Sequence, residues 1–214
     1  MKLIKVENYE EMSKVAAKYI LDLVKAKPDA TLGLATGSSP IGLYKILIES
    51  YNKKEVSFKD VKTFNLDEYC GLPKEHKETY YNFMHRNLFN HIDIKEENTH
   101  IPSSGKDLQK ACDEYNALLS KNIIDLQLLG IGANGHIGFN EPGTSFKSVT
   151  QIITLTDKTR QDNKRFFNSL DEVPTHAITM GIKNIMAAKM IVLVANGKNK
   201  ADAINKLVNG PVTE

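Results

Sequence analysis

The sequence predicts an α/β protein with a doubly wound, mostly parallel sheet and helices on both faces of that sheet. Two observations lead to this prediction. Short apolar runs alternate along the chain with segments of helical periodicity, which is typical of repeated β-α-β units. The run from Ala30 to Ala35 is apolar at almost every position, as expected of a strand that a parallel sheet buries on both faces.

Size and composition limit the possible classes of protein. A chain of 214 residues can bury a full core, so we expect residues 1–214 to form one domain. The 28 basic and 26 acidic residues are interspersed, and the net charge of +2 gives no reason to expect a nucleic-acid partner. There is no signal peptide pattern, and no apolar run approaches the roughly 20 residues of a membrane span. Cys70 and Cys112 lack the spacing of zinc ligands and fit reduced, buried thiols of a soluble, cytoplasmic protein.

The elements follow in order from the hydrophobic periodicity of the chain. Residues 3–6 alternate like an edge strand, and Asn8 with Glu11 resembles a capping box that opens a helix closed by Pro28. Further strands or extended segments are expected at 30–35, 61–66, 123–130, 148–155, 177–180 and 189–195. Helices are expected from about residue 41 to residue 50 and at 78–90, 106–120, 158–167, 182–188 and 198–208. In such Rossmann-like sheets, ligands bind beyond the carboxyl ends of the strands.

The segment Thr36-Gly-Ser-Ser-Pro40 follows a buried strand and opens a helix, so its N–H groups, its hydroxyls and the helix dipole suit a phosphate. It matches neither the Walker A nor the dinucleotide-binding pattern. The alternative is an ordinary helix N-cap formed by Ser38 or Ser39. Arg165 and Lys200 are candidate partners of the anion. A bound phosphate would offset the unfavourable placement of Lys200 at a helix start, although a solvated lysine is the simpler interpretation of that residue alone.

Asp67 ends the predicted strand 61–66 among apolar and aromatic residues. A carboxylate at the end of a strand that faces the ligand crevice is partly desolvated and can act as a base. The alternative is a loop carboxylate that caps the next segment. The neighbouring Glu68 should point the other way if strand alternation continues.

The segment from Leu126 to Pro142 carries His136 among closely spaced glycines, with Glu141 five residues later. Glycines permit positive φ angles and a close approach of the backbone to a ligand, and the carboxylate can orient the imidazole. The segment has neither a nucleophile elbow nor paired-histidine spacing. We therefore expect proton transfer by His136 rather than covalent or metal catalysis.

Several ordered segments together resemble the glucosamine-6-phosphate deaminase family, and its shorter bacterial members in particular. They are residues 34–40, 64–69, 71–76, 130–144, 163–167 and 173–182. The resemblance implies conversion of glucosamine 6-phosphate and water into fructose 6-phosphate and ammonia, in amino sugar catabolism. It implies a small sugar phosphate as the partner, no metal or organic cofactor, and a protein that is either a monomer or a homo-oligomer.

The resemblance also implies roles for individual residues. Asp67 takes the proton from C2 and returns it at C1 through an enol intermediate, and His136 moves the proton that opens the pyranose ring. Asn134 and Glu141 orient and tune His136. The phosphate is held by the backbone of Gly37 and by the side chains of Ser38, Ser39, Arg165 and Lys200.

The chain departs from the family at three places. Position 134 is Asn, whereas the allosteric enteric-type members carry Asp, so Asn134 can only position the imidazole and Glu141 remains the main electrostatic partner. Gln151 and Ile153 stand where allosteric members carry basic residues that bind N-acetylglucosamine 6-phosphate, and we expect no activation by that compound. The sequence stops at Glu214, where family members continue through a short segment and a strand, so either a C-terminal segment is missing or the domain closes without it.

Two other functions fit parts of the pattern. A 6-phosphogluconolactonase shares the broad fold and a phosphate loop, but it should not carry both the segment 64–69 and the segment 135–142. A sugar-phosphate sensor that regulates transcription should carry a helix-turn-helix and a basic face, and the sequence shows neither.

Overall fold

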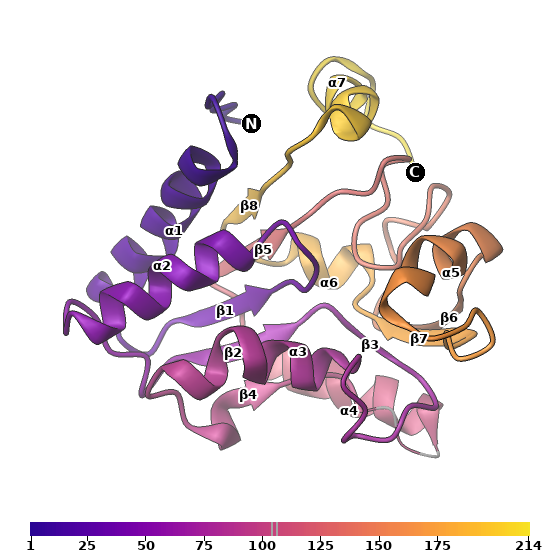
Figure 1. Cartoon of the computed structure of the whole chain (residues 1–214), viewed down its shortest axis with the longest axis horizontal. Coiled ribbons are helices and arrows are strands. Elements are labelled where there is room, and N and C mark those ends of the chain that lie inside the picture. Colours follow the sequence, from indigo (N-terminus) through magenta and orange to yellow (C-terminus); the bar gives the residue numbers. More distant parts are fainter. Residues whose placement is uncertain (104, 106) are drawn as a thin grey trace.

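The structure, a computed structural model, describes residues 1–103, 105 and 107–214, apart from the side chains of Lys158, Asp162 and Arg165 (Figure 1). Its centre is a five-stranded sheet in the order β4-β2-β1-β5-β8, and every neighbouring pair is parallel. These strands are β1 Thr31–Leu34, β2 Lys62–Asn65, β4 Thr99–His100, β5 Leu126–Leu129 and β8 Ile191–Leu193. The predicted class, a mostly parallel α/β sheet, is confirmed. All residues of β1 and β5 are buried, as the apolar runs in the sequence require.

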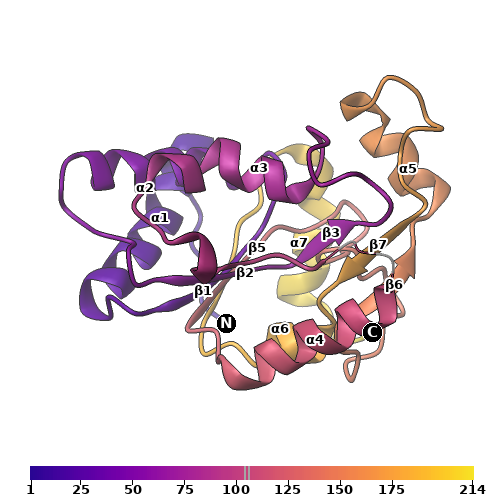
Figure 2. The same cartoon turned by 90° about the horizontal axis from the view of Figure 1, so that it is seen from below.

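Helices cover both faces of this sheet (Figures 1 and 2). On one face, α1, α2 and α3 pack over β1 and β5 through an apolar cluster that includes Ile20, Leu43 and Met84. On the other face, α4 and α6 pack through Tyr115 and Ile185 against residues such as Phe64. The helix bounds are α1 Tyr9–Ala26, α2 Ile41–Asn52, α3 Tyr80–Asn87, α4 Leu108–Lys121, α5 Asp157–Asn163, α6 Ile182–Met186 and α7 Ala201–Asn209. Four 3₁₀ turns complete the described elements, η1 Phe89–His91, η2 Glu96–Asn98, η3 Lys164–Phe166 and η4 Lys198–Lys200.

Near the start of the sequence, the predicted helix after Asn8 is confirmed, whereas the predicted edge strand at residues 3–6 is absent. Asn8 is the N-cap of α1, and its side chain accepts the N–H of Glu11 at 2.9 Å. Residues 3–6 are not a strand. They pair with no strand in the described part of the chain, and Leu3 is 51% exposed. A four-residue segment without a neighbour to share its backbone hydrogen bonds has nothing to hold it extended.

A second, antiparallel sheet in the order β3-β7-β6 was not predicted. It consists of β3 Asp67–Tyr69, β7 His176–Thr179 and β6 Gln151–Thr154. Leu66 joins the two sheets, because its N–H donates to the carbonyl of Leu34 at 3.2 Å and its own carbonyl accepts the N–H of Met180 at 2.7 Å. Asp67 therefore begins a new strand directly after the predicted strand 61–66, and the alternative of a loop carboxylate is wrong.

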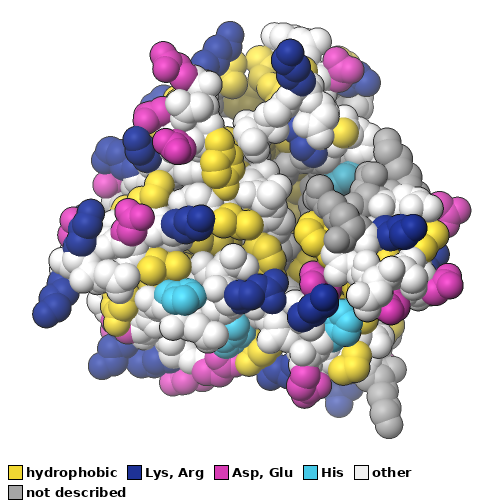
Figure 3. Space-filling view, viewed as in Figure 1, with side chains coloured by type: hydrophobic (Ala, Val, Ile, Leu, Met, Phe, Trp, Pro, Cys, Tyr) yellow, Lys and Arg dark blue, Asp and Glu magenta, His cyan; other side chains and the backbone are white. Residues whose placement is uncertain are grey.

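The distribution of charged side chains and the state of the two cysteines agree with what the composition predicts. Lysine, arginine and acidic side chains are interspersed over the face seen in Figure 3. Cys70 and Cys112 are free and buried, and they pack in one small cluster with Ala111 and Ile178. Among the described residues, no helix has the length and apolar character needed to cross a bilayer.

A buried carboxylate ties together three segments at the amino ends of the central strands. Asp125 is 6% exposed, and its Oδ2 accepts from the ammonium of Lys27 at 2.6 Å and from the N–H of Thr31 at 2.9 Å. Its Oδ1 accepts from the ammonium of Lys189 at 2.8 Å. These donors outweigh the effect of burial and hold the pKa of Asp125 at about 2.

We expect Asp125→Asn to lower the free energy of unfolding by about 2 kcal/mol, since the amide loses both ionic partners and turns a donor toward one of them. For a domain of this size that loss lowers Tm by roughly 4–8 °C, which thermal unfolding at pH 7 measures. Asp22→Asn is the matched control, because Asp22 pairs with Lys18 at 2.6 Å on the exposed face of α1. Equal losses in the two variants would contradict a special role for Asp125.

Candidate active site

The candidate residues lie where parallel strands end, which is the edge of an open sheet at which ligands bind. The loop 36–40 follows β1, Asp67 follows β2 after one residue, and the loop 130–142 follows β5. Lys200 lies in η4, after β8. Because β1, β2, β5 and β8 are parallel, all four of these segments leave the same edge of the sheet (Figure 1).

The loop 36–40 is held by a tyrosine side chain and not by a serine cap. The N-cap of α2 is Pro40, and no described side chain makes a capping hydrogen bond there. The alternative to a phosphate site, an ordinary N-cap formed by Ser38 or Ser39, is therefore wrong. Tyr9 of α1 holds the loop, because its hydroxyl donates to the carbonyl of Ser38 at 2.9 Å and accepts the N–H of Gly42 at 2.8 Å. Gly37 and Ser38 are exposed and Ser39 is half-buried, so the loop is accessible to a ligand.

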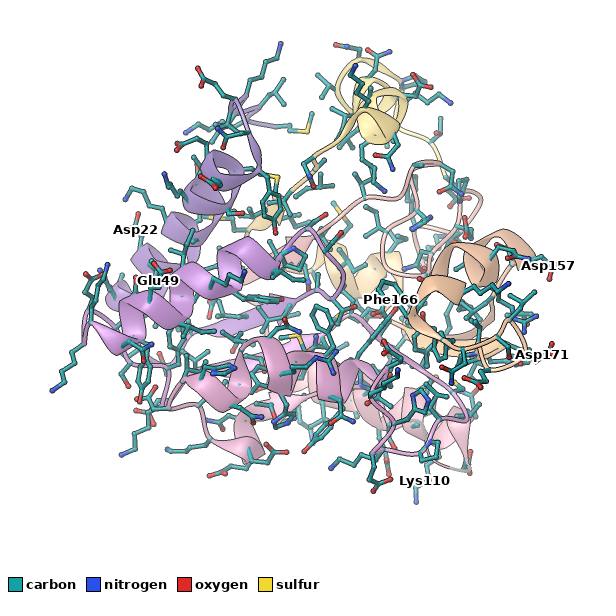
Figure 4. All side chains as sticks on the ribbon, in the orientation of Figure 1. Asp22, Glu49, Lys110, Asp157, Phe166 and Asp171 are labelled. Carbon is teal, nitrogen blue, oxygen red and sulfur yellow. The ribbon has the colours of Figure 1, made fainter. Side chains whose placement is uncertain are left out.

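The two candidate cations differ in what the structure describes. Lys200 is the N-cap residue of α7 and is half-buried, at the edge of the sheet where the loop 36–40 lies. The backbone of Arg165 lies in η3, but its side chain is outside the described residues. Phe166, the residue after Arg165, is 43% exposed, and in the view of Figure 4 it lies near the middle of the molecule, whereas Asp157 at the start of α5 lies at the right-hand edge.

Asp67 faces the loop that carries His136. It is 6% exposed and pairs with Thr179 of β7. A Cβ placed on Gly138 would lie 3.2 Å from Asp67 Oδ2 and 3.0 Å from Thr179 Oγ1, and the φ of Gly138 is +60°. The hydroxyl of Thr179 also accepts the N–H of Phe139 at 3.2 Å. Gly138 thus brings the loop directly against the carboxylate, as a larger residue could not.

The two neighbouring carboxyl groups, Asp67 and Glu68, are both buried but differ in their hydrogen-bond partners. Desolvation, with a smaller contribution from the charge of Glu68, raises the pKa of Asp67 to about 8. Glu68 points the other way, as strand alternation predicts, and accepts the N–H groups of Tyr69, Tyr80 and Tyr81 at 2.8 to 2.9 Å. These bonds lower the pKa of Glu68, but burial is the larger effect and raises it overall. Glu68 therefore fixes the start of α3, while Asp67 stays available to a ligand.

His136, Asn134 and Glu141 form a hydrogen-bonded chain. The amide oxygen of Asn134 lies 2.7 Å from His136 Nδ1 and 3.2 Å from the His136 backbone nitrogen. Its amide nitrogen donates to Glu141 Oε2 at 2.6 Å, whereas His136 Nδ1 is 3.9 Å from the same oxygen. Because a carboxylate only accepts, the Asn134 nitrogen must face Glu141, and its oxygen must accept from Nδ1–H. Neutral His136 thus carries its proton on Nδ1 and has its basic lone pair on Nε2.

The backbone keeps this histidine in place. The N–H of Gly132 donates to the carbonyl of His136 at 2.8 Å, which closes a tight turn. A Cβ on Gly132 would overlap the imidazole ring. Glycine at this position is therefore required by the close packing of the ring against the backbone.

The structure brings Asp67, Asn134, His136 and Glu141 together and adds contacts that sequence reasoning missed. Tyr9 holds the loop 36–40, Thr179 lies beside Asp67, and Thr159 of α5 donates to Glu141 Oε1 at 3.1 Å. Tyrosine and threonine are common residues, and these contacts join segments far apart in the sequence. No local signal could have indicated them.

Comparison with known proteins agrees with this arrangement. The family model described as glucosamine-6-phosphate isomerases/6-phosphogluconolactonase matches residues 5–214. The chain is 55% identical to a glucosamine-6-phosphate deaminase of Thermoanaerobacter sp. (strain X514), with 100% of this chain and 85% of the relative covered. It is 54% identical to the deaminase of Clostridium novyi (strain NT), with 99% and 89% covered.

Solved structures show the same relationship. A monomeric glucosamine-6-phosphate deaminase superposes with a TM-score of 0.96 at 47% identity, covering 100% of this chain and 89% of that one. A 6-phosphogluconolactonase from Trypanosoma brucei reaches 0.80 at 17% identity, covering 99% and 88%, a likeness that shows the shared fold alone. The chain therefore belongs to the family of glucosamine-6-phosphate isomerases and 6-phosphogluconolactonases.

Proposed function

We propose that the protein converts glucosamine 6-phosphate and water into fructose 6-phosphate and ammonia. The observation that carries the proposal is that Gly138, in the loop that carries the hydrogen-bonded residues His136, Asn134 and Glu141, lies against the buried carboxyl group of Asp67. A carboxyl group and an imidazole brought near each other in this way can act as two proton-transfer groups. Relatives at 50 to 55% identity are named for this deamination, which supports it over lactone hydrolysis or a sensor without activity.

The phosphate anchors the substrate in this proposal. Gly37, Ser38 and Ser39 offer backbone and hydroxyl donors at the start of α2, and Lys200 adds a positive charge, with Arg165 as a second cation. The strand ends hold the loop 36–40 at a fixed position relative to Asp67, because β1 and β2 are hydrogen-bonded neighbours. Binding energy from the phosphate thereby orients C1 and C2 of the sugar at the proton-transfer groups.

His136 opens the sugar ring. With Nδ1–H donated to Asn134, Nε2 takes the proton of the hydroxyl on C1 and delivers it to the ring oxygen, and the bond between C1 and that oxygen breaks. The imidazolium that forms in between is stabilised by the carboxylate of Glu141, which lies 3.9 Å from Nδ1. Asn134 carries no charge, so its contribution is to orient the ring.

Asp67 then moves the proton between the two carbons. As a carboxylate it takes the proton from C2, the electrons form a C1–C2 double bond, and the C1 oxygen gains the proton that the ammonium nitrogen on C2 gives up. The protonated Asp67 then returns its proton at C1, and the lone pair of the resulting amino nitrogen forms the C=N bond of an iminium at C2. Water adds to C2, a proton passes to the nitrogen, and the C–N bond breaks to release ammonia. The free protein holds Asp67 protonated up to about pH 8, but the ammonium group of the bound amino sugar favours its ionised form.

No metal or organic cofactor enters this proposal, since each step is a proton transfer or an addition of water. We further propose a cytoplasmic enzyme of amino sugar catabolism that needs neither nucleic acid nor a membrane. Similarity to a monomeric deaminase makes a monomer the first state to test against a homo-oligomer.

Wild-type protein is expected to release equal amounts of ammonia and fructose 6-phosphate from glucosamine 6-phosphate, measured by coupled assays, with no hydrolysis of 6-phosphogluconolactone. Asp67→Asn keeps the shape of the side chain but cannot take the proton, so kcat should fall by roughly 10²–10⁴-fold. KM should change by less than about threefold, because the phosphate contacts remain. Asp22→Asn on the exposed face of α1 is the control. Near wild-type turnover in Asp67→Asn would place the base elsewhere.

The pKa of Asp67 also predicts how stability depends on pH. The ordinary pKa is 3.8 and the folded value is about 8, so between these values the unfolded chain releases this proton while the folded chain keeps it. The contribution of Asp67 to the free energy of unfolding is therefore present below pH 4 and is lost as the pH rises to about 8. Asp67→Asn cannot titrate, so its Tm relative to wild type should rise between pH 5 and pH 8 in thermal unfolding. A constant difference would contradict the raised pKa.

Addition of N-acetylglucosamine 6-phosphate should leave the rate unchanged at a fixed, subsaturating concentration of substrate. Gln151 donates to Asn140 at 3.4 Å, and Ile153 packs in the cluster around Tyr69 and Phe139, so neither supplies a positive charge for a second phosphate. Initial rates with and without the compound measure this. An increase in rate would show that an activating site exists.

A further inference from the structure

We propose that Thr159 is a positioning residue for ring opening, which acts by holding Glu141 and, through it, Asn134 and His136. The proposal rests on the function proposed above, because it assigns a part of that reaction to a residue on α5. We assign Thr159 an orienting role only, because the hydrogen bond that supports the proposal joins Thr159 to Glu141 and not to His136 or Asp67.

The contact geometry fixes the direction of each hydrogen bond. Thr159 Oγ1 lies 3.1 Å from Glu141 Oε1 and 2.9 Å from Thr156 Oγ1. A carboxylate only accepts, so the single hydroxyl proton of Thr159 goes to Glu141, and Thr156 must donate to Thr159. Thr156 is the N-cap of α5 and also accepts the N–H of Thr159 at 3.1 Å. The hydroxyl of Thr156 therefore donates to Thr159, and the hydroxyl of Thr159 donates to Glu141.

Glu141 receives donors on both of its oxygens. Thr159 donates to Oε1 and Asn134 donates to Oε2, so the carboxylate plane is fixed from two different segments of the chain. Burial alone does not fix it, because 33% of the Glu141 side chain is exposed. Without the threonine hydroxyl, the carboxylate is free to rotate about its remaining partner.

Rotation of Glu141 would disturb His136 through Asn134. Glu141 Oε2 is 2.6 Å from the Asn134 nitrogen and 3.9 Å from His136 Nδ1, so a small movement changes which of the two it contacts. Direct capture of Nδ1–H by Glu141 would pull the imidazole away from the Asn134 oxygen and change the direction of Nε2. The carboxyl group of Asp67 on β3 lies against Gly138 of the same loop, but it is not part of the hydrogen-bonded series that runs from Thr159 through Glu141 to His136.

Two variants test the threonine hydroxyl. Thr159→Val preserves shape and removes the hydroxyl, and Thr159→Ser keeps the hydroxyl. The matched control is Thr175→Val, which removes an exposed hydroxyl that contacts His176 at the start of β7. We expect Thr159→Val to lower kcat on glucosamine 6-phosphate about tenfold, with KM changed less than about twofold, while Thr159→Ser and Thr175→Val stay within about twofold of wild type.

A second substrate separates positioning from general damage. The 4,5-dideoxy analogue of glucosamine 6-phosphate cannot close a pyranose or furanose ring, so it needs no ring opening. Thr159→Val should turn over this analogue within about twofold of the wild-type rate. An equal loss on both substrates would overturn the proposal in favour of a structural role, and no loss on either would also overturn it.

A measurement without substrate keeps the test independent of the proposed reaction and of activity in the variant. Nuclear magnetic resonance of ¹⁵N-labelled protein should show the hydrogen-bonded Nδ1–H of His136 in wild type and in Thr159→Ser, with faster exchange with water in Thr159→Val. Equal exchange in all three proteins would overturn the proposal even if the enzyme deaminates its substrate. The expected difference would support the positioning role even if the natural substrate proved to be another sugar phosphate.

Discussion

The arrangement of this protein depends on the backbone hydrogen bonds of one residue, Leu66. Its N–H completes the pairing of β2 with β1, and its carbonyl accepts from Met180 at the end of β7. The chain therefore leaves the parallel sheet and enters the antiparallel sheet without a loop. This junction places Asp67 on the border between the two sheets, next to the β1 neighbour that leads into the loop 36–40 and against Gly138 of the loop that carries His136. A flexible connection at this point would leave Asp67 without a fixed distance to either loop.

Asp67 and Glu68 show how neighbouring carboxyl groups acquire different chemistry. Successive side chains of a strand point to opposite faces, so the two carboxyl groups meet different numbers of hydrogen-bond donors. Three backbone N–H groups meet Glu68, and these satisfy a buried acid while they also fix α3. Asp67 is buried against Gly138, and its pKa rises to about 8. An acid in that state is poised between proton donor and proton acceptor near neutral pH, as an isomerisation that first takes and then returns a proton requires.

Much of this arrangement could be predicted from the sequence. Local signals sufficed for the N-cap at Asn8, the buried strand β1 and the glycine-rich loop around His136, because each depends on residues that are close along the chain. The extended segments expected at 148–155 and 177–180 contain β6 and β7, but the antiparallel sheet that they form with β3 could not be predicted in this way. β3 has three residues and begins with two acids, and its pairing joins Asp67 to Thr179, more than a hundred residues later. Strand propensity is weak over such a length, and tertiary context decides the outcome.

The hydroxyl of Tyr9 has a practical consequence for work on this protein. Tyr9 is the first residue of α1, yet it joins Ser38 and Gly42 across the start of α2. The first turn of α1 is thus connected to the loop 36–40 through the Tyr9 hydroxyl. Affinity tags, truncations and fusions are usually placed at chain ends because ends tolerate change. Here a fusion that unwinds the first turn of α1 would loosen the loop 36–40, so such a fusion partner belongs before Asn8 with a spacer that leaves the helix cap intact.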